Sequence, residues 1–378
     1  MKNKPTLIDL FCGCGGLSLG LEQAGFQTIF ANEIDNRLFK TYIYNRSLKE
    51  NEYFLGDIKK LNLMLERNEI KFTDVDLICG GPPCQGFSMA NRQRILDDPR
   101  NELYKAFLIF LQKVRPNFFI MENVKGMSKK IDEILNDFET YLGEGYNYTY
   151  SVLNSKDFGI PQNRERLFII GNKIGVSSKE IFNQINKQKL SKKYVLKDAI
   201  FDLPKLLPNR SKNNSLKENE KIGFYERSYD YPFSKYAMEI NNNKIVKNLY
   251  NHRNRFNNDR DIEIFTLLPQ GGNSLHKSIS KIMPYKNRNH IFKDKYFKLD
   301  ENKVSKTITS HMKYDCNMYI HPNQSRGLSP REAARIQSFP DDYIFKGTPN
   351  QWYAQIGNAV PVKLAEFIGK AILKTLKQ

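Results

Sequence analysis

The feature that most constrains the fold is an alternation of strand and helix patterns over the first 170 residues. Residues 17–24 and 103–114 have helical spacing, and the second stretch places several large apolar residues on one face. The alternation predicts a doubly wound α/β sheet with ligand sites at the strand ends. The predicted strands are short apolar runs at residues 6–11, 27–31, 74–79 and 117–121, with further candidates at 152–153 and 167–170.

The alternation of strand and helix patterns disappears between residue 171 and about residue 325. Residues 208–215 have the composition of a linker, and the remainder interleaves aromatic residues with Lys and Arg, as in 250–255. We therefore expect a smaller, irregular second domain. The expected boundaries are 1–195 for a catalytic and ligand-binding domain, 196–345 for the second domain, and 346–378 for a C-terminal segment that returns to the first domain.

Cys84 stands in the run Gly80-Gly81-Pro82-Pro83-Cys84-Gln85-Gly86-Phe87-Ser88, directly after a predicted strand. An open α/β sheet carries its chemistry at the carboxyl ends of its strands, and prolines fix the backbone so that the sulfur is held in one direction. A lone cysteine in a loop is as often a buried structural residue as a nucleophile. The run alone leaves both interpretations open.

Glycines follow the first predicted strand, where they let a ligand approach the backbone. Glu33 lies twenty residues after Gly13, at the end of the second strand, where an acidic side chain can accept hydrogen bonds from a ribose. Ser18 replaces the third glycine of the dinucleotide fingerprint, which disfavours NAD and favours a nucleoside such as S-adenosylmethionine. Cys12 and Cys14 lack a metal-binding pattern, so we predict small residues packed in the loop.

The chain carries 59 Lys and Arg against 41 Asp and Glu, a net charge of +18. A soluble protein this basic favours a nucleic-acid partner, although a lysine-rich composition also accompanies codon bias. Five cysteines are an odd number for a disulfide framework, which favours a reducing cytoplasm. No apolar stretch is long enough to span a membrane, and no signal peptide is expected before the first strand.

Glu122 follows the next predicted strand after that of Cys84, so the two side chains are expected to face one pocket. A thiolate beside a carboxylic acid suits attack on a ring that is protonated elsewhere. Taken in isolation, Glu122 is equally a surface carboxylate that ends a strand.

Six motifs in order resemble the DNA (cytosine-5) methyltransferase family over nearly the whole chain, and the resemblance implies a Rossmann-like S-adenosylmethionine methyltransferase sheet with a target-recognition domain. The motifs are Asp9-Leu10-Phe11-Cys12-Gly13-Cys14-Gly15-Gly16, Pro83-Cys84-Gln85, Glu122-Asn123-Val124, Gln162-Asn163-Arg164-Glu165-Arg166, Arg331-Glu332-Ala333-Ala334-Arg335-Ile336-Gln337-Ser338-Phe339-Pro340 and Gln355-Ile356-Gly357-Asn358-Ala359-Val360-Pro361.

The resemblance implies that Cys84 adds to C6 of a flipped cytosine, so that C5 takes the methyl group of S-adenosylmethionine. Glu122 is then expected to bind the base at N3 and at its exocyclic amine. Arg164 and Arg166, two apart on a predicted strand, are expected to face the same side and to support the Cys84 loop and the base. The residue that removes the C5 proton is not named by the sequence.

The same resemblance implies the ligand contacts. The expected cofactor-binding residues are Phe11, Gly13, Cys14, Gly15, Gly16, Glu33, Ile34, Asp57, Ile58, Pro82 and Leu103, with Asn358 and Val360 closing the pocket. The expected DNA-binding residues are Gln85, Ser88 and Thr307. No metal site is expected. Ser329 and Glu332 form a predicted capping box, with Pro330 at the first helical position.

The resemblance favours a cytoplasmic, nucleoid-associated bacterial modification enzyme. We expect a monomer acting on double-stranded DNA, with a cognate restriction endonuclease encoded separately. A tRNA-directed member of the family is the nearest alternative, but the long middle region favours DNA. A zinc deaminase would need His-x-Glu and Pro-Cys-x-x-Cys, which the chain lacks. A non-enzymatic DNA-binding protein would not need Cys84, Glu122 and Arg166 together.

Overall fold

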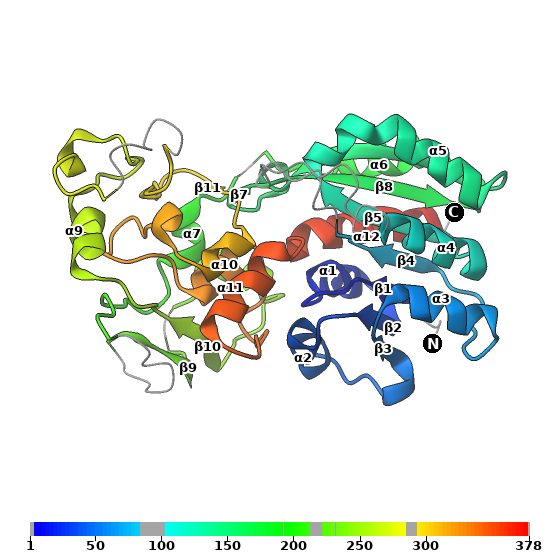
Figure 1. The fold of residues 1–378 in the computed structure, drawn as a ribbon, viewed down its shortest axis with the longest axis horizontal. Helices are drawn as coiled ribbons and strands as arrows, with labels where there is room; N and C mark the ends of the chain where they lie inside the picture. Colours follow the sequence, from blue (N-terminus) through cyan, green and yellow to red (C-terminus); the bar gives the residue numbers. More distant parts are fainter. Residues whose placement is uncertain are drawn as a thin grey trace. The chain divides into compact units, whose positions relative to one another are not determined.

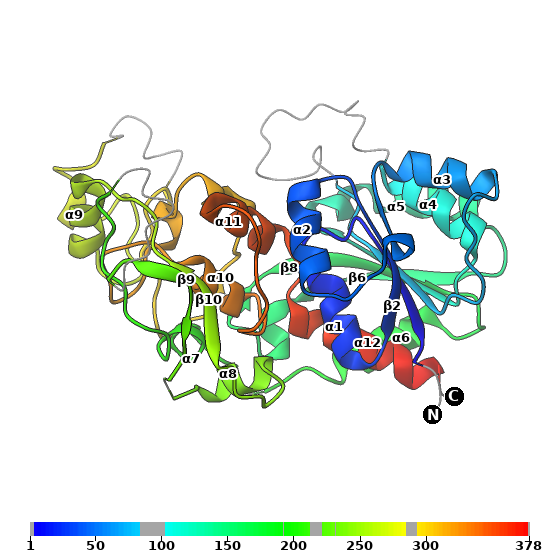
Figure 2. The same ribbon diagram turned by 90° about the horizontal axis from the view of Figure 1, so that it is seen from below.

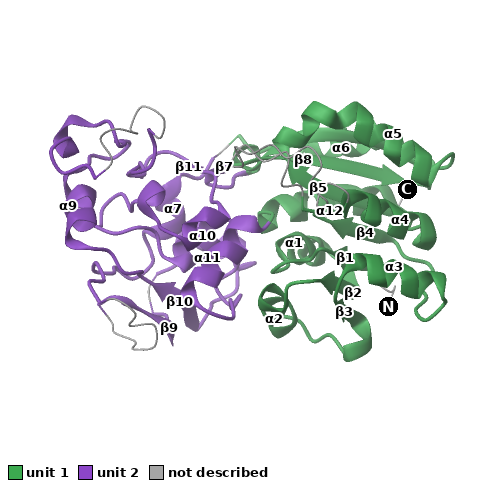
Figure 3. Cartoon of the chain, viewed as in Figure 1, with its two compact units in different colours: residues 1–158, 164–191, 360–378 green, residues 159–163, 192–359 purple. Residues whose placement is uncertain are grey.

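The computed structural model describes residues 4–83, 103–191, 193–211, 221–230, 232–284 and 293–376. The chain forms two compact units (Figure 3): unit 1 comprises residues 1–158, 164–191 and 360–378, and unit 2 comprises residues 159–163 and 192–359. The sequence-based boundaries differ from this division in three places. Residues 159–163, 192–195 and 346–359 belong to unit 2, whereas the sequence assigned them to the first domain or to the segment returning to it.

Unit 1 is built on a seven-stranded sheet in the order β3-β2-β1-β4-β5-β8-β6. The first five strands in that order are parallel, and β8 runs antiparallel to both of its neighbours. The strand order reverses between β1 and β4, so the loops after these strands are neighbours at the carboxyl edge. The strands are β1 Thr6–Leu10, β2 Gln27–Glu33, β3 Tyr53–Leu55, β4 Leu77–Gly80, β5 Phe118–Val124, β6 Asn147–Asn154 and β8 Glu165–Asn172.

Helices cover both faces of this sheet (Figures 1 and 2). Helices α3 Ile58–Glu66, α4 Leu103–Val114 and α5 Ile131–Leu142 pack on one face, where their apolar side chains join those of the strands in one core. Helices α1 Gly16–Ala24, α6 Ser178–Asn186 and α12 Val362–Leu376 pack together on the other. Helix α2 Asn36–Tyr44 follows β2, and none of the described helices is long and apolar enough to cross a membrane.

Helices α1 and α12 approach closely because glycines lie at their contact. A Cβ on Gly20 would lie 2.2 Å from the Val362 carbonyl oxygen, and one on Gly369 would lie 2.7 Å from the Ala24 Cβ. The C-terminal helix thereby packs closely against the first helix of unit 1.

Unit 2 consists of short elements joined by long irregular segments. Two strand pairs, β9–β10 and β7–β11, are its described sheets. The capping box of α10 is confirmed: Ser329 Oγ accepts from the Glu332 amide, and Glu332 Oε2 accepts from the Ser329 amide. The elements are β7 Gln162–Asn163, β9 Gly223–Ser228, β10 Asn248–Arg253, β11 Ser305–Lys306, α7 Leu196–Ile200, α8 Lys235–Ile240, α9 Asp259–Leu267, α10 Pro330–Ile336 and α11 Pro349–Asn358.

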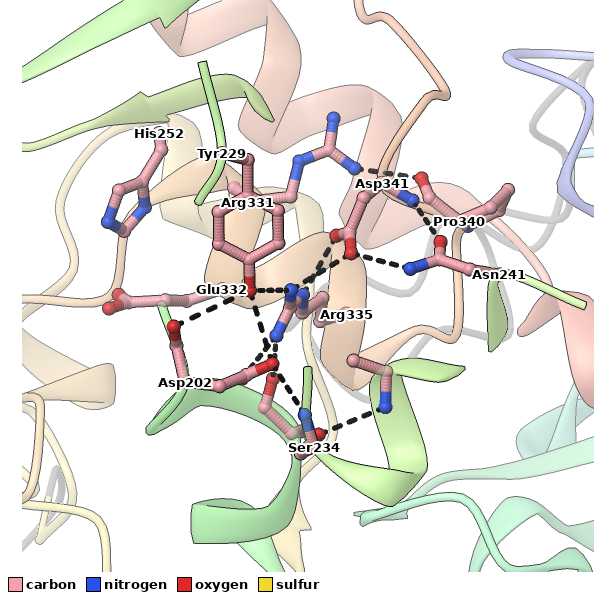
Figure 4. Close-up of polar contacts among 12 residues, drawn as sticks. Asp202, Tyr229, Ser234, Asn241, His252, Arg331, Glu332, Arg335, Pro340 and Asp341 are labelled. Carbon is pink, nitrogen blue, oxygen red and sulfur yellow. Dashed lines mark hydrogen bonds and ion pairs between the residues drawn. The ribbon is translucent and has the colours of Figure 1, made fainter. Parts of the chain in front are cut away.

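A buried polar network holds these elements together around Arg335, as Figure 4 shows. The guanidinium binds both oxygens of Asp341, at 2.8 and 2.9 Å, and also contacts Asp202 and the Tyr229 hydroxyl. Arg331, which is also buried, donates instead to three backbone carbonyls. Arg335 is thus a structural residue of unit 2, because its fork of donors is filled by side chains from separate segments.

Candidate active site

Glu122 and Arg166 form a buried ion pair on neighbouring strands of unit 1. Arg166 Nε lies 3.0 Å from Glu122 Oε1, and the two side chains are 15% and 12% exposed. Val124 on β5 pairs with Arg166 on β8, so Glu122 is the diagonal neighbour of Arg166 on the same face of the sheet. Burial raises the pKa of the Glu122 carboxyl, and the positive charges of Arg166 and Arg164 oppose that rise.

Arg164 is buried but does not lie on the predicted strand. It is the single residue between β7 and β8, and its carbonyl accepts hydrogen bonds from the amide and the hydroxyl of Ser155. The expectation of one continuous strand through Arg164 and Arg166 is therefore wrong, because β7 ends at Asn163 and β8 begins at Glu165. Both arginines nevertheless act electrostatically on Glu122.

The segment that leads to Cys84 begins beside this carboxylate. A Cβ on Gly81 would meet Glu122 Oε2 at 3.2 Å, and Asn123 Nδ2 donates to the Pro82 carbonyl at 2.9 Å. The Asn123 amide therefore ties the first residues after β4 to β5, and the Glu122 carboxylate lies beside them. Cys84, Gln85 and Ser88 themselves lie outside the described residues.

Glu33 ends β2 with both carboxylate oxygens bound by backbone amides. Oε2 accepts from the Gly13 amide at 2.8 Å, and Oε1 accepts from the amides of Ile34 and Asp35, each at 2.9 Å. Burial raises the pKa of Glu33 and these three amides oppose the rise. A carboxylate has about four acceptor positions, so Oε2 retains capacity for a further donor such as a hydroxyl group.

The loop after β1 has an unusual backbone. Phe11, Gly13 and Gly15 all have left-handed φ values, of 54°, 57° and 83°. This conformation costs a residue with a side chain about 1 kcal/mol or more, and such strain concentrates at functional sites. Among the described residues, a Cβ on Gly13 would meet nothing within 4 Å, which leaves this side of the loop open to an approaching molecule. Cys12 and Cys14 are buried, as predicted.

The remaining residues expected around a nucleoside in unit 1 differ in exposure. Ile34 is 67% exposed, which is unusual for a large apolar side chain and suits a flat ring laid against it. Asp57 caps α3 by accepting from the Lys59 amide at 2.9 Å, and Ile58 is buried behind it. Pro82 is buried and Leu103 half-buried. A carboxylate, an open glycine loop and an exposed apolar side chain form a donor and contact set that fits a nucleoside.

Three further predicted site residues come from the C-terminal part of the chain. Thr307, in unit 2, donates from Oγ1 to the Asn163 carbonyl at 2.7 Å, next to the β7–β11 pairing. Asn358 is the exposed last residue of α11 in unit 2, whereas Val360 is buried and belongs to unit 1. The pair that was expected to close the pocket is thus divided between the units.

The sequence left two buried residues without a role. Asn123 lies in the Glu122-Asn123-Val124 motif, and the contact of its side-chain amide with the Pro82 carbonyl gives this residue a structural role. Asn32 donates from Nδ2 to the carbonyls of Phe54 and Gly56, each at 2.9 Å, and so ties β2 to the loop before Asp57. The sequence signal that would have identified both is an Asn at the end of an apolar run that is predicted to be a buried strand.

Comparisons with known proteins agree with this geometry. The family model for C-5 cytosine-specific DNA methylases matches residues 6–374. The chain is 34% identical to the type II methyltransferase M.MthTI of Methanothermobacter thermautotrophicus over 376 residues, 98% of each chain. It is 33% identical to the type II methyltransferase M.NgoFVII of Neisseria gonorrhoeae, covering 98% of this chain and 87% of that protein.

A solved structure agrees as well. A prophage-encoded protein from E. coli, described as a DNA modification methyltransferase, superposes with a TM-score of 0.73 at 28% identity, covering 99% of this chain and 100% of that one. The strand order, the carboxylate-bearing strand ends and these full-length matches together show that the chain belongs to the C-5 cytosine-specific DNA methylases and is a DNA (cytosine-5)-methyltransferase.

Proposed function

We propose that this enzyme transfers a methyl group from S-adenosylmethionine to C5 of a cytosine that is turned out of duplex DNA, with Cys84 as the nucleophile. The observation that carries the proposal is the buried Glu122, whose pKa is raised and which lies beside the residues that lead to Cys84. A carboxyl group of this kind holds or donates a proton where the attacked ring needs one.

Cytosine C5 is a weak nucleophile, and Cys84 makes it a stronger one. The Cys84 thiolate forms a bond to C6, and the ring electrons move so that C5 can form its new bond to the methyl group while the bond from that methyl group to the donor's sulfur breaks and its electron pair stays on the sulfur. The C5 proton then leaves to a base, the bond from Cys84 to C6 breaks, and the aromatic ring is restored. The thiolate form is required, and the positive charge of Arg164 and Arg166 favours it.

Glu122 and the two arginines hold the base during this sequence. Glu122 binds N3 and the exocyclic amine, so that charge arriving in the ring is neutralised at N3. Arg166 fixes the orientation of the Glu122 carboxylate through its contact at 3.0 Å. Arg164 supports the loop of Cys84 from the break between β7 and β8.

The methyl donor is held at the carboxyl edge of the sheet in unit 1. When bound, S-adenosylmethionine supplies an electrophilic methyl group on a positively charged sulfur. Glu33 accepts the ribose hydroxyls, Ile34 packs on the adenine ring, and Asp57 with Ile58 binds its edge. Phe11, Gly13, Cys14, Gly15 and Gly16 form the loop side of this site, and Pro82, Leu103 and Val360 complete it within unit 1.

Unit 2 is proposed to recognise the target sequence, and unit 1 to carry out the transfer. A cytosine within a duplex must leave the stack before a thiol can reach C6, at a cost of about a few kcal/mol. Thr307 steadies the backbone near the flipped base, while Gln85 and Ser88 contact DNA from the cysteine loop. The enzyme is expected to act as a monomer in the bacterial cytoplasm, beside a separately encoded restriction endonuclease.

The test is expression of the native chain and of Cys84→Ser in a host without DNA methylation, followed by bisulfite sequencing of DNA and of tRNA. We expect 5-methylcytosine in one short DNA sequence with the native chain and none with Cys84→Ser. Cys316→Ala is the control, because Cys316 is a buried cysteine of unit 2 and its Cβ is retained. Methylation of tRNA alone, or persistence of DNA methylation in Cys84→Ser, would overturn the proposal.

A further inference from the structure

Arg46 contacts the glycine loop, which is residues 11–15 between β1 and α1, and has no part in the reaction described above. It lies two residues beyond the end of α2, with a side chain only 7% exposed. Its Nη2 donates to the Gly15 carbonyl at 3.2 Å and to Ser18 Oγ at 3.1 Å, and its Nε donates to Glu22 Oε1 at 3.0 Å. One guanidinium therefore joins the loop to the first two turns of α1.

The position of this guanidinium is itself fixed. Its Cζ lies 4.0 Å from the centroid of the Tyr42 ring, within the range of a cation–π contact. Glu22 gives it a carboxylate partner on α1. A planar group with several donors can satisfy three partners in fixed directions, which a lysine ammonium on a flexible stem cannot reproduce.

The two glycines of the loop have different neighbours. A Cβ on Gly15 would lie 2.6 Å from Arg46 Nη1, so this glycine makes room for the arginine. Among the described residues, a Cβ on Gly13 would meet nothing within 4 Å, and the Gly13 amide binds Oε2 of the buried Glu33 at 2.8 Å. The loop is thus held on its Gly15 side by Arg46, while its Gly13 side contacts the Glu33 carboxylate.

We propose that Arg46 is a positioning residue for cofactor binding, which holds the glycine loop and through it the Glu33 carboxylate in the conformation that receives S-adenosylmethionine. The inference rests on the proposed function, because it concerns the same site. Arg46 acts before the cofactor arrives: it removes the need to order the loop on binding, and a preformed site binds more tightly.

The test compares Arg46→Met and Arg46→Lys with the native chain by calorimetric titration of S-adenosylmethionine, in the absence of DNA. We expect Arg46→Met to weaken binding about tenfold, the size of one charge-assisted hydrogen bond, and Arg46→Lys to recover part of the loss. In steady-state assays KM for S-adenosylmethionine should rise while kcat at saturation changes little. Amide hydrogen exchange of the protein without cofactor should quicken over residues 12–18 in Arg46→Met.

Arg115→Met provides the control within unit 1. Arg115 also donates to a backbone carbonyl, that of Leu142 at 2.9 Å, and lies over the Tyr146 ring. It precedes β5, at the amino edge of the parallel strands, whereas the glycine loop follows β1 at the carboxyl edge. We expect Arg115→Met to bind S-adenosylmethionine as the native chain does.

The outcomes separate the two proposals. If the native chain itself fails to bind S-adenosylmethionine, the proposed function is wrong. If the native chain binds it and folded Arg46→Met binds it equally well, the positioning role of Arg46 is wrong. Equal losses of affinity in Arg46→Met and Arg115→Met would also overturn that role, because they would reflect general destabilisation.

Discussion

Glu122 takes its reactivity from its surroundings. An exposed glutamate is fully ionised at neutral pH, but burial among β5 and β8 raises the pKa of this one. Arg166 opposes the shift and also fixes the direction of the carboxylate. Glu165, the residue before Arg166, is also a glutamate, but it is exposed and pairs with Lys125 at the surface. Side-chain chemistry at this site is therefore decided by which face of the sheet a residue occupies.

Replacement of Glu122 by Gln is expected to lower the rate of methyl transfer about 10²- to 10⁴-fold, the range contributed by a positioned acid or base. Gln keeps the shape of the side chain but cannot supply a proton to the ring. Single-turnover transfer of a labelled methyl group to DNA measures the effect. Glu165→Gln is the matched control and should retain the native rate; equal losses in both variants would contradict the role given to Glu122.

At the scale of single residues, the buried His252 also leads us to predict that the protein loses stability in mild acid. Burial lowers the pKa of His252 to about 4, and its ring nitrogens contact Ser329 Oγ at 2.9 Å and the Pro204 carbonyl at 2.8 Å. The unfolded chain, with a pKa near 6.5, binds the proton first as the pH falls. The free energy of unfolding should therefore decrease between about pH 6.5 and pH 4, by about 3 kcal/mol from this group.

Urea unfolding of the native chain and of His252→Gln across this range measures the contribution. The difference between the two proteins is the quantity to compare, because carboxyl groups with raised pKa values, such as Asp9 at about 6, change stability in the opposite direction. The stability of His252→Gln should depend less steeply on pH than that of the native chain. Parallel pH profiles would show that His252 does not titrate on unfolding.

At the scale of elements, the contact between α1 and α12 depends on the absence of a side chain. Alanine is a better helix former than glycine by about 1 kcal/mol, so Gly20→Ala would stabilise an isolated α1. In the folded chain the added methyl group would lie 2.2 Å from the Val362 carbonyl oxygen and 2.5 Å from the Ala365 Cβ. We expect a net destabilisation of about 1–3 kcal/mol, visible in thermal unfolding. A stabilised Gly20→Ala would mean that the helices separate at no cost.

The sequence predicted most of the sheet in unit 1 because buried parallel strands are continuous apolar runs. The runs at 27–31, 117–121 and 167–170 correspond to β2, β5 and β8. No range was predicted for strand β3, because its three residues, although apolar, are too few to form a recognisable run. The positions of Glu33 and Glu122 near the carboxyl ends of β2 and β5 followed from the apolar runs, whereas the position of Arg46 did not, because its partners are 24 to 31 residues away.

Unit 2 was predicted only in outline. Its stability comes from contacts such as that of Arg335 with Asp202, which are 133 residues apart, and of Asn241 with Asp341, which are 100 apart. Local periodicity carries no information about such pairs. The exception is α10, whose capping box is entirely local and was predicted at the correct residues.

At the scale of the whole molecule, the net charge of +18 predicts strong dependence of DNA binding on salt. Each phosphate contact releases counterions, so affinity falls with salt in proportion to the number of contacts. For about six contacts, the dissociation constant should increase about 10³-fold between 50 and 200 mM salt. Fluorescence anisotropy with a labelled duplex measures this slope. An affinity that is flat across that range would show that the excess charge does not face DNA.

The return of α12 to unit 1 also bears on how the protein is made. Chains are synthesised from the N-terminus, and domains generally fold as units while synthesis proceeds. Unit 1, however, includes residues 360–378, which the ribosome adds only after all of unit 2. The surface of α1 that receives α12, where Leu21 lies beside Gly369, is without its native cover during that interval. All segments of unit 2 are synthesised before α12 is complete. Unit 1, which contains the first residues of the chain, is therefore the last unit to have all of its segments.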